Sequence, residues 1–371
     1  MRILILSSEY PPGPGGIGRH AADLSLALTN KGYHVDVMAS LDYENKHRIN
    51  KYIETLPLKI EIFPFKRMGW FTYIYRVRAV LKQLKKKSYE RIIVTGMFPL
   101  WLGALVKLFY NKKVHLDSFI HGSEVNPSNP FLRMLTHWSL KKADHIWAVS
   151  GFTASLLPLG LINKNNMTLL PNGIHSSDWI RYIHSKPFSN WEGYPKLLTV
   201  GNVTPRKGQH RVIKALPALI KGFPNIHYHI IGLPTHEKEI RELAENLGVS
   251  KHITIHGKFN SKLELARAYR SADLFLMLSE NQKNGDVEGF GIAILEANFF
   301  GLPAIGAYGC GIEDAIKSEI NGELVDGNNP IKIAQMIKNI LDHKTKYSSQ
   351  LSNWVVEHDW NVLIEKFISF K

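Results

Sequence analysis

The chain has 371 residues, 44% of them hydrophobic, with a net charge of +14 and one cysteine, Cys310. This length predicts two globular domains, and the lone cysteine excludes an internal disulfide and any cysteine-cluster metal site. Apolar stretches stay well short of the roughly 18 residues of a membrane span, and the run at 3–6 is too short for a signal peptide. We therefore expect a cytosolic protein.

Two successive series of elements run along the chain. In residues 1–170, β-type runs alternate with helical patterns, which predicts parallel β/α units with helices on both faces of a sheet. Strands are expected there at 3–7, 34–39, 60–63, 91–94, 114–120 and 145–149, and helices at 18–30, 73–87, 100–109 and 130–142. After a polar stretch near 175–195, strands are expected at 196–201, 227–232, 253–256, 274–278 and 303–306, and helices at 209–221, 237–247, 262–272, 292–300 and 330–343.

The sequence thus predicts an α/β protein with two Rossmann-like domains, residues 1–172 and residues 190–354. A last helix, at about residues 355–371, is expected to pack back on the first domain. Ligands of open parallel sheets bind at the carboxyl ends of the strands. In a two-domain protein of this kind that edge faces the cleft between the domains, so residues that follow strands are the candidates for a site.

The positive charge is concentrated in the first half of the chain. Residues 1–170 carry 23 Lys and Arg against 11 Asp and Glu, whereas residues 171–371 carry 23 against 21. A one-sided basic domain indicates an anionic partner, such as a membrane surface, a nucleic acid or a phosphorylated substrate. There is no helix-turn-helix, zinc-finger or RNA-recognition signature, so nucleic acid is not expected as a partner.

The segment from Lys66 to Lys87 is the most basic part of the chain. From Tyr73 onward its apolar residues recur at helical spacing with Lys and Arg on the other face, and aromatic residues cluster at its start. This pattern is typical of a helix that lies on an anionic membrane surface. The alternative is a helix that packs its apolar face on the core and leaves its basic face in water.

A glycine-rich loop, Pro14 to Arg19, follows the first expected strand. Its glycines, Gly15, Gly16 and Gly18, precede a helix and are suited to hold a phosphate or a sugar close to the backbone. The loop also loosely resembles the dinucleotide-binding fingerprint, so a nicotinamide-dependent enzyme is a rival interpretation, although no suitable acidic residue ends a second strand. A purely structural tight turn is the third interpretation.

Further candidate residues follow two other strands. Arg206 and Lys207 precede a helix and present charges suited to a diphosphate, with a solvated basic turn as the alternative. His121 follows an apolar strand and is suited to bind a sugar hydroxyl or to carry a proton, with a structural role as the alternative. The 17 histidines show no metal-ligand spacing, so no bound metal is expected.

The stretch 288–296, Glu-Gly-Phe-Gly-Ile-Ala-Ile-Leu-Glu, carries the strongest functional signal. Gly289 and Gly291 favour an irregular turn, and the run after them predicts a buried helix whose N-terminus offers N–H groups to a phosphate or sugar. Glu296 then lies within an apolar helix, where its carboxylate requires hydroxyl, amide or cationic partners. The alternative is a helix with a solvated glutamate in its first turn and a structural salt bridge.

Together these motifs resemble the retaining GT-B glycosyltransferases, specifically glycosyltransferase family 4, over nearly the whole chain. The strongest component is the Glu-x7-Glu motif from Glu288 to Glu296. The supporting motifs lie at 15–16, 121–124, 148–150, 171–174, 207–208, 257 and 301–303. The order and spacing of these motifs make the resemblance specific, and it implies a GT-B fold with two domains facing across a deep cleft.

The resemblance implies a role for each matching position. Glu296 would hold the ribose hydroxyls of a nucleotide-diphosphate sugar, and Glu288 the hydroxyls of its sugar. Lys207 would neutralise the diphosphate, and His121 would lie beside the sugar near the reacting carbon. These last three, His121, Glu288 and Lys207, are the expected catalytic residues. The other implied donor-binding positions are Gly15, Gly16, Gly289, Phe290, Gly291 and Ile292 and, for the base, Lys258 and Phe259.

The family also implies transfer with retained anomeric configuration and with neither a cofactor nor a divalent metal. The charge that develops on the leaving diphosphate would be offset by Lys207, the glycine-loop amides and a helix N-terminus. Same-face attack, in which a phosphate oxygen takes the proton of the acceptor, requires no carboxylate nucleophile.

The chain departs from the family at two places. Asn202 is also an implied donor-binding position, but it stands where the family often has an arginine, and Arg206 is the candidate replacement as a donor-binding cation. The loop at 279–287 is longer than in many members and resembles a subgroup that contains bacterial mannosyltransferases acting on membrane lipids. This second departure favours GDP-mannose as the donor, with a UDP-sugar as the alternative.

We therefore expect a glycosyltransferase that moves a hexose to a glycan or lipid-linked acceptor in cell-surface polysaccharide or glycolipid biosynthesis. It is expected at the inner face of a bacterial cytoplasmic membrane. A sugar-nucleotide epimerase of the same fold and a non-catalytic nucleotide-sugar-binding protein are the alternatives. The sequence identifies neither the acceptor nor an oligomeric state.

Overall fold

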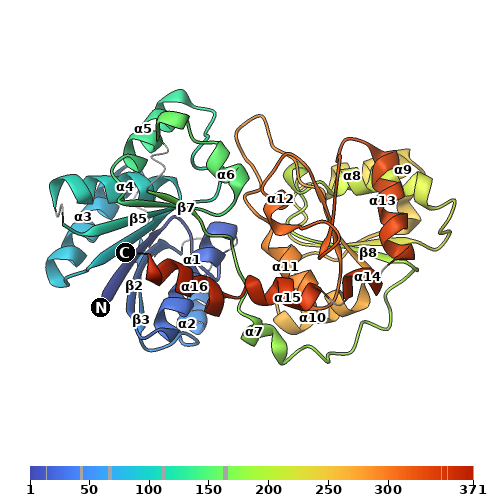
Figure 1. The fold of residues 1–371 in the computed structure, drawn as a ribbon, viewed down its shortest axis with the longest axis horizontal. Coiled ribbons are helices and arrows are strands. Elements are labelled where there is room, and N and C mark those ends of the chain that lie inside the picture. Colours follow the sequence, from blue (N-terminus) through green and yellow to red (C-terminus); the bar gives the residue numbers. More distant parts are fainter. Residues whose placement is uncertain are drawn as a thin grey trace. The chain divides into compact units, whose positions relative to one another are not determined.

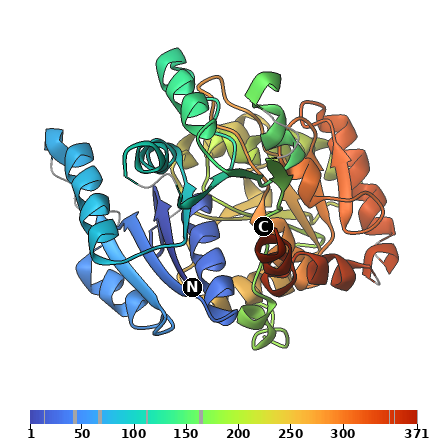
Figure 2. The same ribbon diagram turned by 60° about the vertical axis from the view of Figure 1, so that its left-hand side comes forward.

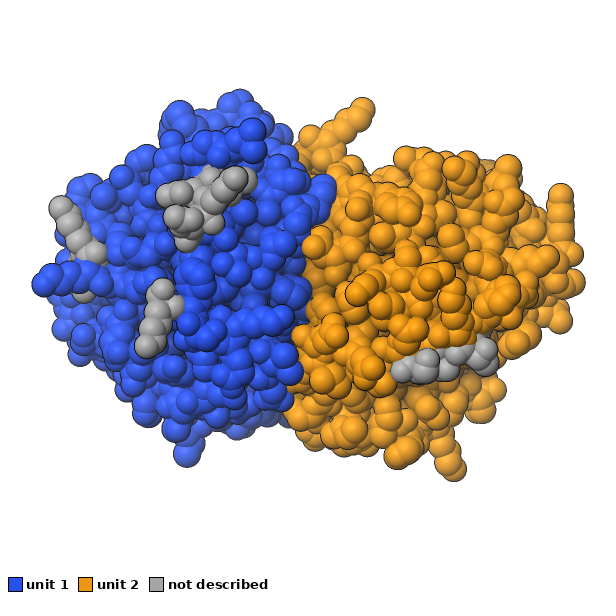
Figure 3. Space-filling model, in the orientation of Figure 1, with its two compact units in different colours: residues 1–173, 360–371 blue, residues 174–359 orange. Residues whose placement is uncertain are grey.

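The computed structural model of the chain describes residues 1–13, 15–41, 45–65, 69–110, 113–161, 166–343, 345–348 and 350–370. Pro14, residues 66–68 and the Trp70 side chain, which belong to segments singled out above, lie outside this description. Two units are distinguished (Figure 3): unit 1 comprises Met1–Gly173 and Trp360–Lys371, and unit 2 comprises Ile174–Asp359. Residues 174–189, left between the two expected domains, therefore belong to unit 2.

The described part of unit 1 is built on a parallel sheet of seven strands in the order β3-β2-β1-β4-β5-β6-β7. Its strands are β1 (Arg2–Ser7), β2 (His34–Ser40), β3 (Ile60–Phe65), β4 (Arg91–Thr95), β5 (His115–Ile120), β6 (His145–Ala148) and β7 (Met167–Leu169). The central strands β1 and β4 contain continuous apolar runs, residues 3–6 and 92–94, because both faces of the sheet are covered. The edge strand β7 was not predicted, since its three residues are incompletely buried and form no long apolar run.

Helices cover this sheet: α1 (Gly16–Asn30), α2 (Lys46–Ile53), α3 (Thr72–Lys86), α4 (Met97–Phe109), α5 (Pro130–Leu140), α6 (Gly151–Ser155) and α16 (Trp360–Ser369). Alternate residues of β1 point to opposite faces, and each face has its own core. Leu4 and Leu6 share one core with α3, α4 and α5. Ile3 and Ile5 share the other core with α1 and α16.

The last helix of the chain belongs to unit 1, where α16 lies beside α1 (Figures 1 and 2). The single helix expected over about residues 355–371 is corrected to two, because α15 (Leu351–Glu357) ends before His358 and α16 begins at Trp360. Between them, the carboxylate of Asp359 accepts a hydrogen bond from the backbone N–H of Ser176 at 2.9 Å. This bond ties the break between the helices to the first residues of unit 2.

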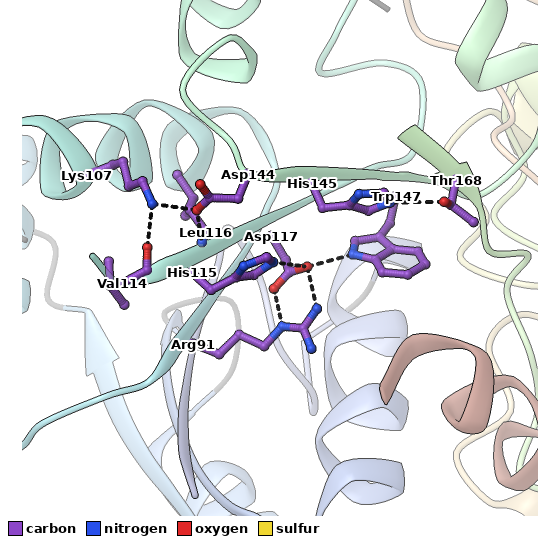
Figure 4. Close-up of polar contacts among 10 residues, drawn as sticks. All are labelled: Arg91, Lys107, Val114, His115, Leu116, Asp117, Asp144, His145, Trp147 and Thr168. Carbon is purple, nitrogen blue, oxygen red and sulfur yellow. Dashed lines mark hydrogen bonds and ion pairs between the residues drawn. The ribbon is translucent and has the colours of Figure 1, made fainter. Parts of the chain in front are cut away.

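A buried polar network connects strands β4, β5 and β6 on the face of the sheet that α16 covers, and its polar contacts are drawn in Figure 4. The Asp117 carboxylate accepts hydrogen bonds from the Trp147 indole at 2.8 Å and from the Arg91 guanidinium at 2.9 Å. The same guanidinium lies 4.3 Å from the ring centroid of Phe367 in α16. Arg91 is the first residue of β4, so this network lies toward the amino ends of the strands, away from the edge where ligands of such sheets bind.

The described part of unit 2 contains a parallel sheet of six strands in the order β10-β9-β8-β11-β12-β13. Its strands are β8 (Lys196–Val200), β9 (His227–Ile231), β10 (Ile253–Ile255), β11 (Leu274–Met277), β12 (Ala304–Ala307) and β13 (Gly322–Val325). Its helices are α7 (Ser176–Ile180), α8 (Gln209–Leu219), α9 (Glu237–Asn246), α10 (Lys262–Ser271), α11 (Ile292–Phe299), α12 (Ile312–Ala315), α13 (Pro330–Asp342), α14 (Thr345–Ser348) and α15. The edge strand β13 was not predicted. The two parallel sheets with their helices confirm the predicted α/β class.

Candidate functional site

Three charged residues of unit 2 meet beyond the carboxyl ends of β8 and β11. Lys207 and Arg206 belong to a short 3-10 turn after β8, and Glu288 belongs to the segment between β11 and α11. One carboxylate oxygen of Glu288, Oε2, lies 2.7 Å from the Lys207 ammonium and also accepts a hydrogen bond from Arg206. Glu288 is 8% exposed. The structure thus brings together three of the positions predicted for donor binding.

The charges of this cluster determine its protonation. Burial opposes ionisation of Glu288, but the charges of Lys207 and Arg206 outweigh it and hold the pKa of the carboxyl below its ordinary value. Burial likewise opposes the charge of Arg206, but Glu288 and Asp286 raise its pKa. Asp286 lies 3.1 Å from the Arg206 Nε atom. The Glu288 carboxylate is therefore ionised at neutral pH and lies between Lys207 and Arg206, and Asp286 also contacts Arg206.

Glycines allow the chain to approach closely around this cluster. Gly208 follows Lys207 with φ of +73°, and a Cβ there would lie 1.9 Å from the carbonyl oxygen of Leu278, at the end of β11. Gly311 donates its N–H to the Glu288 carbonyl at 2.9 Å, and a Cβ on Gly311 would lie 2.0 Å from the carbonyl oxygen of Gly289. Side chains at 208 and 311 would therefore push apart the segments that carry the charges.

The helix that follows the predicted turn carries Glu296. Gly291 precedes α11 with φ of +95°, and Phe290 is almost fully buried, so the turn at 289–291 leads directly to the first amides of α11, from Ile292. The carboxylate of Glu296, which is partly buried, accepts a hydrogen bond from the Tyr269 hydroxyl at 2.8 Å. This hydroxyl is the kind of partner that the sequence required for Glu296.

The long loop ahead of Glu288 is held by specific hydrogen bonds. The backbone N–H of Glu280 donates to the Arg206 carbonyl at 2.8 Å, and the Asn281 amide donates to the Gly309 carbonyl at 2.7 Å. The buried Arg211 donates to the Ser279 carbonyl at 3.0 Å and lies 2.7 Å from the Glu280 carboxylate. The loop is therefore fastened to the turn that carries the two cations.

The other positions predicted to bind the nucleotide in unit 2 lie after β8 and after β10. Asn202 directly follows Gly201 at the end of β8 and is exposed, and its carbonyl accepts a hydrogen bond from the Gln209 side chain at 3.0 Å. Arg206 and Lys207 share the carboxylate of Glu288. Lys258 is exposed after β10, and the ring of Phe259 lies 5.9 Å from that of Phe188.

In unit 1 the glycine loop surrounds a carboxylate. Gly15 has φ of +131°, and a Cβ there would lie 2.2 Å from the Glu9 carboxylate, which accepts a hydrogen bond from the Gly18 N–H at 3.1 Å. Burial raises the pKa of Glu9, and bonds from the Gly18 and Ile17 amides oppose this rise. A Cβ at Gly16 would face open space, so this residue leaves room for a ligand beside the backbone.

His121 also lies at the carboxyl edge of the unit 1 sheet, directly after β5. Its Nε2 atom lies 2.8 Å from the Thr95 hydroxyl, and its ring centroid lies 4.7 Å from that of His20 in α1. Burial lowers the pKa of His121 to about 3, so the ring is neutral at physiological pH. Its backbone N–H donates to the buried carboxylate of Glu124, whose pKa burial raises to about 7.

Three residues of these clusters were missed from the sequence. Tyr269 and Arg211 lie on helices whose sequence patterns indicate only packing on an apolar core, and Glu9 precedes a Tyr-Pro-Pro turn. Only Glu9 could have been found from the sequence. A helix that begins at glycines has free backbone N–H groups, and a nearby carboxylate can accept hydrogen bonds from them. Within the described residues no group of three or more His, Cys, Asp or Glu is placed to hold a metal ion. The same residues include no helix of the length and apolarity that a membrane span requires.

Comparisons with known proteins find families and solved structures that this chain resembles. The family model "Glycosyltransferase Family 4" matches residues 14–178, and "Glycosyl transferases group 1" matches residues 183–354. A GDP-mannose-dependent alpha-(1-6)-phosphatidylinositol monomannoside mannosyltransferase of Mycolicibacterium smegmatis is 30% identical over 361 residues, which cover 91% of this chain and 89% of that protein. The protein of the same name from Mycobacterium tuberculosis is 24% identical over 382 residues, covering 100% and 97%. Among solved structures, a glycosyltransferase from Rickettsia africae matches with a TM-score of 0.78 at 18% identity, covering 99% of this chain and 97% of that one.

Proposed function

We propose that this chain, which belongs to glycosyltransferase family 4, transfers mannose from GDP-mannose to a lipid-linked or glycan acceptor. That it is a glycosyltransferase of the GT-B fold follows from its family and from its structural neighbours. The observation that carries the donor proposal is the cluster of Arg206, Lys207 and Glu288 at the strand ends of unit 2. The choice of GDP-mannose rests on relatives named as GDP-mannose-dependent mannosyltransferases.

In the proposed donor complex, the diphosphate lies against Lys207 and Arg206. Two adjacent cations suit a diphosphate because charge-assisted hydrogen bonds are stronger than neutral ones. The amides at the start of α11, beginning at Ile292, add donors to the phosphate and sugar oxygens. Glu288 then binds sugar hydroxyls and Glu296 binds the ribose, while the base lies beside the backbone of Lys258 and Phe259.

The proposed reaction breaks the bond between the anomeric carbon and the diphosphate oxygen, and both electrons of that bond go to the diphosphate. Lys207 and Arg206 stabilise the charge that develops there. The acceptor hydroxyl attacks from the same face, its oxygen bonds to the anomeric carbon, and its proton passes to the leaving phosphate oxygen. Configuration is retained, and this step uses neither a carboxylate nucleophile nor a divalent metal. His121, whose ring is neutral at physiological pH, is suited to hydrogen bonding and not to a role as a cation.

Thermal-shift screening against GDP-, UDP- and ADP-sugars tests the donor, because selective binding raises apparent stability by mass action. GDP-mannose is expected to give the largest shift, and a larger shift with a UDP-sugar would replace it. Lys207→Ala and Glu296→Ala should each lower the donor efficiency by at least about tenfold, a loss of about 1.4 kcal/mol. Lys251→Ala and Glu245→Ala, both at exposed positions of unit 2, are the matched controls.

The same assay separates the competing functions. Conversion of the sugar nucleotide with no acceptor present would support the epimerase, and donor binding without turnover of any acceptor would support a non-catalytic protein. Full turnover after chelation of divalent metals is expected. The anomeric configuration of the product, read by NMR, tests retention.

We also propose that α3 docks unit 1 on the cytoplasmic face of an anionic membrane. Val80 and Leu84 pack on the core of unit 1, so the core-facing interpretation of this helix holds for its middle and end. At its start, however, Phe71 is 68% exposed, Tyr73 58% and Ile74 53%, and Arg78 and Lys82 farther along the helix are also exposed. Exposed aromatic and apolar side chains with Lys and Arg suit the interface of an anionic bilayer.

Sedimentation with anionic vesicles at low salt tests this docking. Wild-type protein is expected in the pellet, and Ile74→Glu is expected in the supernatant. Val356→Glu changes a comparably exposed apolar residue of unit 2 and serves as the control. Retention of Ile74→Glu on the vesicles would contradict docking through α3.

A further inference from the structure

The two cations assigned to the diphosphate already have a partner within unit 2. Both approach the same oxygen of Glu288, Oε2, with the Lys207 ammonium at 2.7 Å. The proposed function, however, requires Glu288 to bind sugar hydroxyls and requires Arg206 and Lys207 to bind the diphosphate. One carboxylate oxygen held between two cations leaves little positive charge for an incoming anion, so these contacts exclude one another.

The pairing is built so that side chains can exchange partners while the backbone stays in place. The turn that carries Arg206 is fixed by the Glu280 N–H, which donates to the Arg206 carbonyl at 2.8 Å. The segment that carries Glu288 is fixed by the Gly311 N–H, which donates to the Glu288 carbonyl at 2.9 Å. The three charged side chains retain some access to solvent, at 24% for Arg206, 15% for Lys207 and 11% for Glu288. Rotation about side-chain bonds is therefore enough to move the carboxylate from the cations to a ligand.

We propose that Glu288 is a competing counter-ion, which holds Arg206 and Lys207 when no diphosphate is bound and exchanges them for the sugar of the donor. This inference rests on the proposed donor site and adds a step to its cycle. An intact donor offers both a diphosphate for the cations and hydroxyls for the carboxylate. The nucleoside diphosphate product offers only the former, so Glu288 loses its partners when the product remains bound.

A difference between donor and product affinity follows from this exchange. The free carboxylate would lie beside the product diphosphate, and its return to Arg206 and Lys207 favours release of the product. Glu288 therefore weakens every ligand that carries a diphosphate without a sugar. The same residue strengthens the intact donor, because a carboxylate accepts hydrogen bonds from hydroxyls.

Titration of inorganic pyrophosphate and of GDP into the full chain tests the proposal, with Glu288→Gln as the variant. Glutamine keeps the shape of the side chain and removes its charge. We expect pyrophosphate and GDP to bind about tenfold more tightly to the variant, which corresponds to about 1.4 kcal/mol. Guanosine should bind both proteins equally, and mannosyl transfer should fall. Glu280→Gln is the control, because Glu280 lies in the same loop as Glu288 but its carboxylate pairs with Arg211. This variant should leave the pyrophosphate affinity unchanged.

Equal or weaker pyrophosphate binding by folded Glu288→Gln would overturn the competition. If this variant does not fold, Asp286→Asn decides, because Asp286 pairs with Arg206 from a side chain that is 49% exposed. Asp286→Asn is expected to bind pyrophosphate about two- to threefold more tightly. This gain is smaller than for Glu288→Gln because exposed ion pairs are weaker than buried ones. No gain in affinity would overturn the proposal. Lys207→Ala tests the donor site separately: undiminished pyrophosphate binding would contradict the proposed function itself.

Discussion

The hydrogen bond from Tyr269 to Glu296 offers a sharp test of how the proposed ribose site is positioned. Tyr269→Phe removes only the hydroxyl that donates to the Glu296 carboxylate at 2.8 Å. The aromatic ring remains, and with it the stacking on Phe300, whose ring centroid lies 5.6 Å away. The substitution therefore changes the orientation of Glu296 and leaves the packing of α10 on α11 intact.

The size of the effect follows from the kind of bond. A hydrogen bond to a charged group contributes about 1.5–3 kcal/mol. Glu296 is only partly buried, so water replaces part of the lost bond and we expect a loss of about 1 kcal/mol in donor binding. This corresponds to a rise of about fivefold in the KM for the donor. The kcat should change little, because Tyr269 is a positioning residue and touches no reacting atom.

Tyr228→Phe is the matched control for this measurement. Tyr228 is as deeply buried in unit 2 as Tyr269, and its hydroxyl donates to Thr199 at 2.7 Å. Both substitutions should lower the free energy of unfolding by about 1 kcal/mol, the usual cost of a lost buried hydrogen bond. Only Tyr269→Phe should raise the KM for the donor. An unchanged KM in Tyr269→Phe, or an equal rise in Tyr228→Phe, would refute the positioning role.

Two further predictions concern the strand ends. Gly208→Ala should lower the free energy of unfolding by about 3 kcal/mol or more, because its Cβ would meet the Leu278 carbonyl. Gly257 has a similar φ of +70° but open space around it, so Gly257→Ala should lower the free energy of unfolding by only about 1 kcal/mol. Denaturant titrations measure both losses. Equal losses would contradict the steric argument. The pKa of His121 is about 3 in the folded protein and 6.5 ordinarily. Between pH 3 and 6.5 the unfolded chain therefore binds a proton at His121 that the folded chain does not bind. The free energy of unfolding should therefore fall as pH drops from 6.5. Unfolding titrations at pH 6.5 and 4.5 measure this fall, and His121→Gln should make it smaller. An unchanged pH dependence in this variant would show that His121 does not contribute.

The sheets could be predicted from the sequence where strands are buried on both faces. Such strands are continuous apolar runs, as in β1 and β4, and they stand out between helical patterns. The edge strands β7 and β13 are three and four residues long and contain half-exposed positions, so they carry no such signal. The break between α15 and α16 was missed for a different reason. It is stabilised by Ser176, which is far away in the sequence.

The same distinction between local and distant information applies to the site. Glycines and glutamates of 288–296 gave the turn, the helix and the need for a partner at Glu296, because these follow from neighbouring residues. The partner itself, Tyr269, is 27 residues away, and Arg206 is 82 residues from Glu288. Local patterns contain no information about which of many tyrosines or arginines the fold brings to such a carboxylate.

Glu9 and Glu288 indicate what a sequence motif leaves out even where it is correctly recognised. Each carboxylate contacts groups that the family resemblance assigns to phosphate or its surroundings: Glu9 contacts amides of the glycine loop, and Glu288 contacts Arg206 and Lys207. Groups at the edge of a sheet that are partly removed from water must be compensated by the protein itself whenever they are not bound to a ligand. A motif records the contacts made to the ligand, whereas the fold must also supply partners for the same groups in the rest of the cycle. The energy of donor binding is then the difference between these two sets of contacts, and this difference is what the Glu288→Gln titration measures.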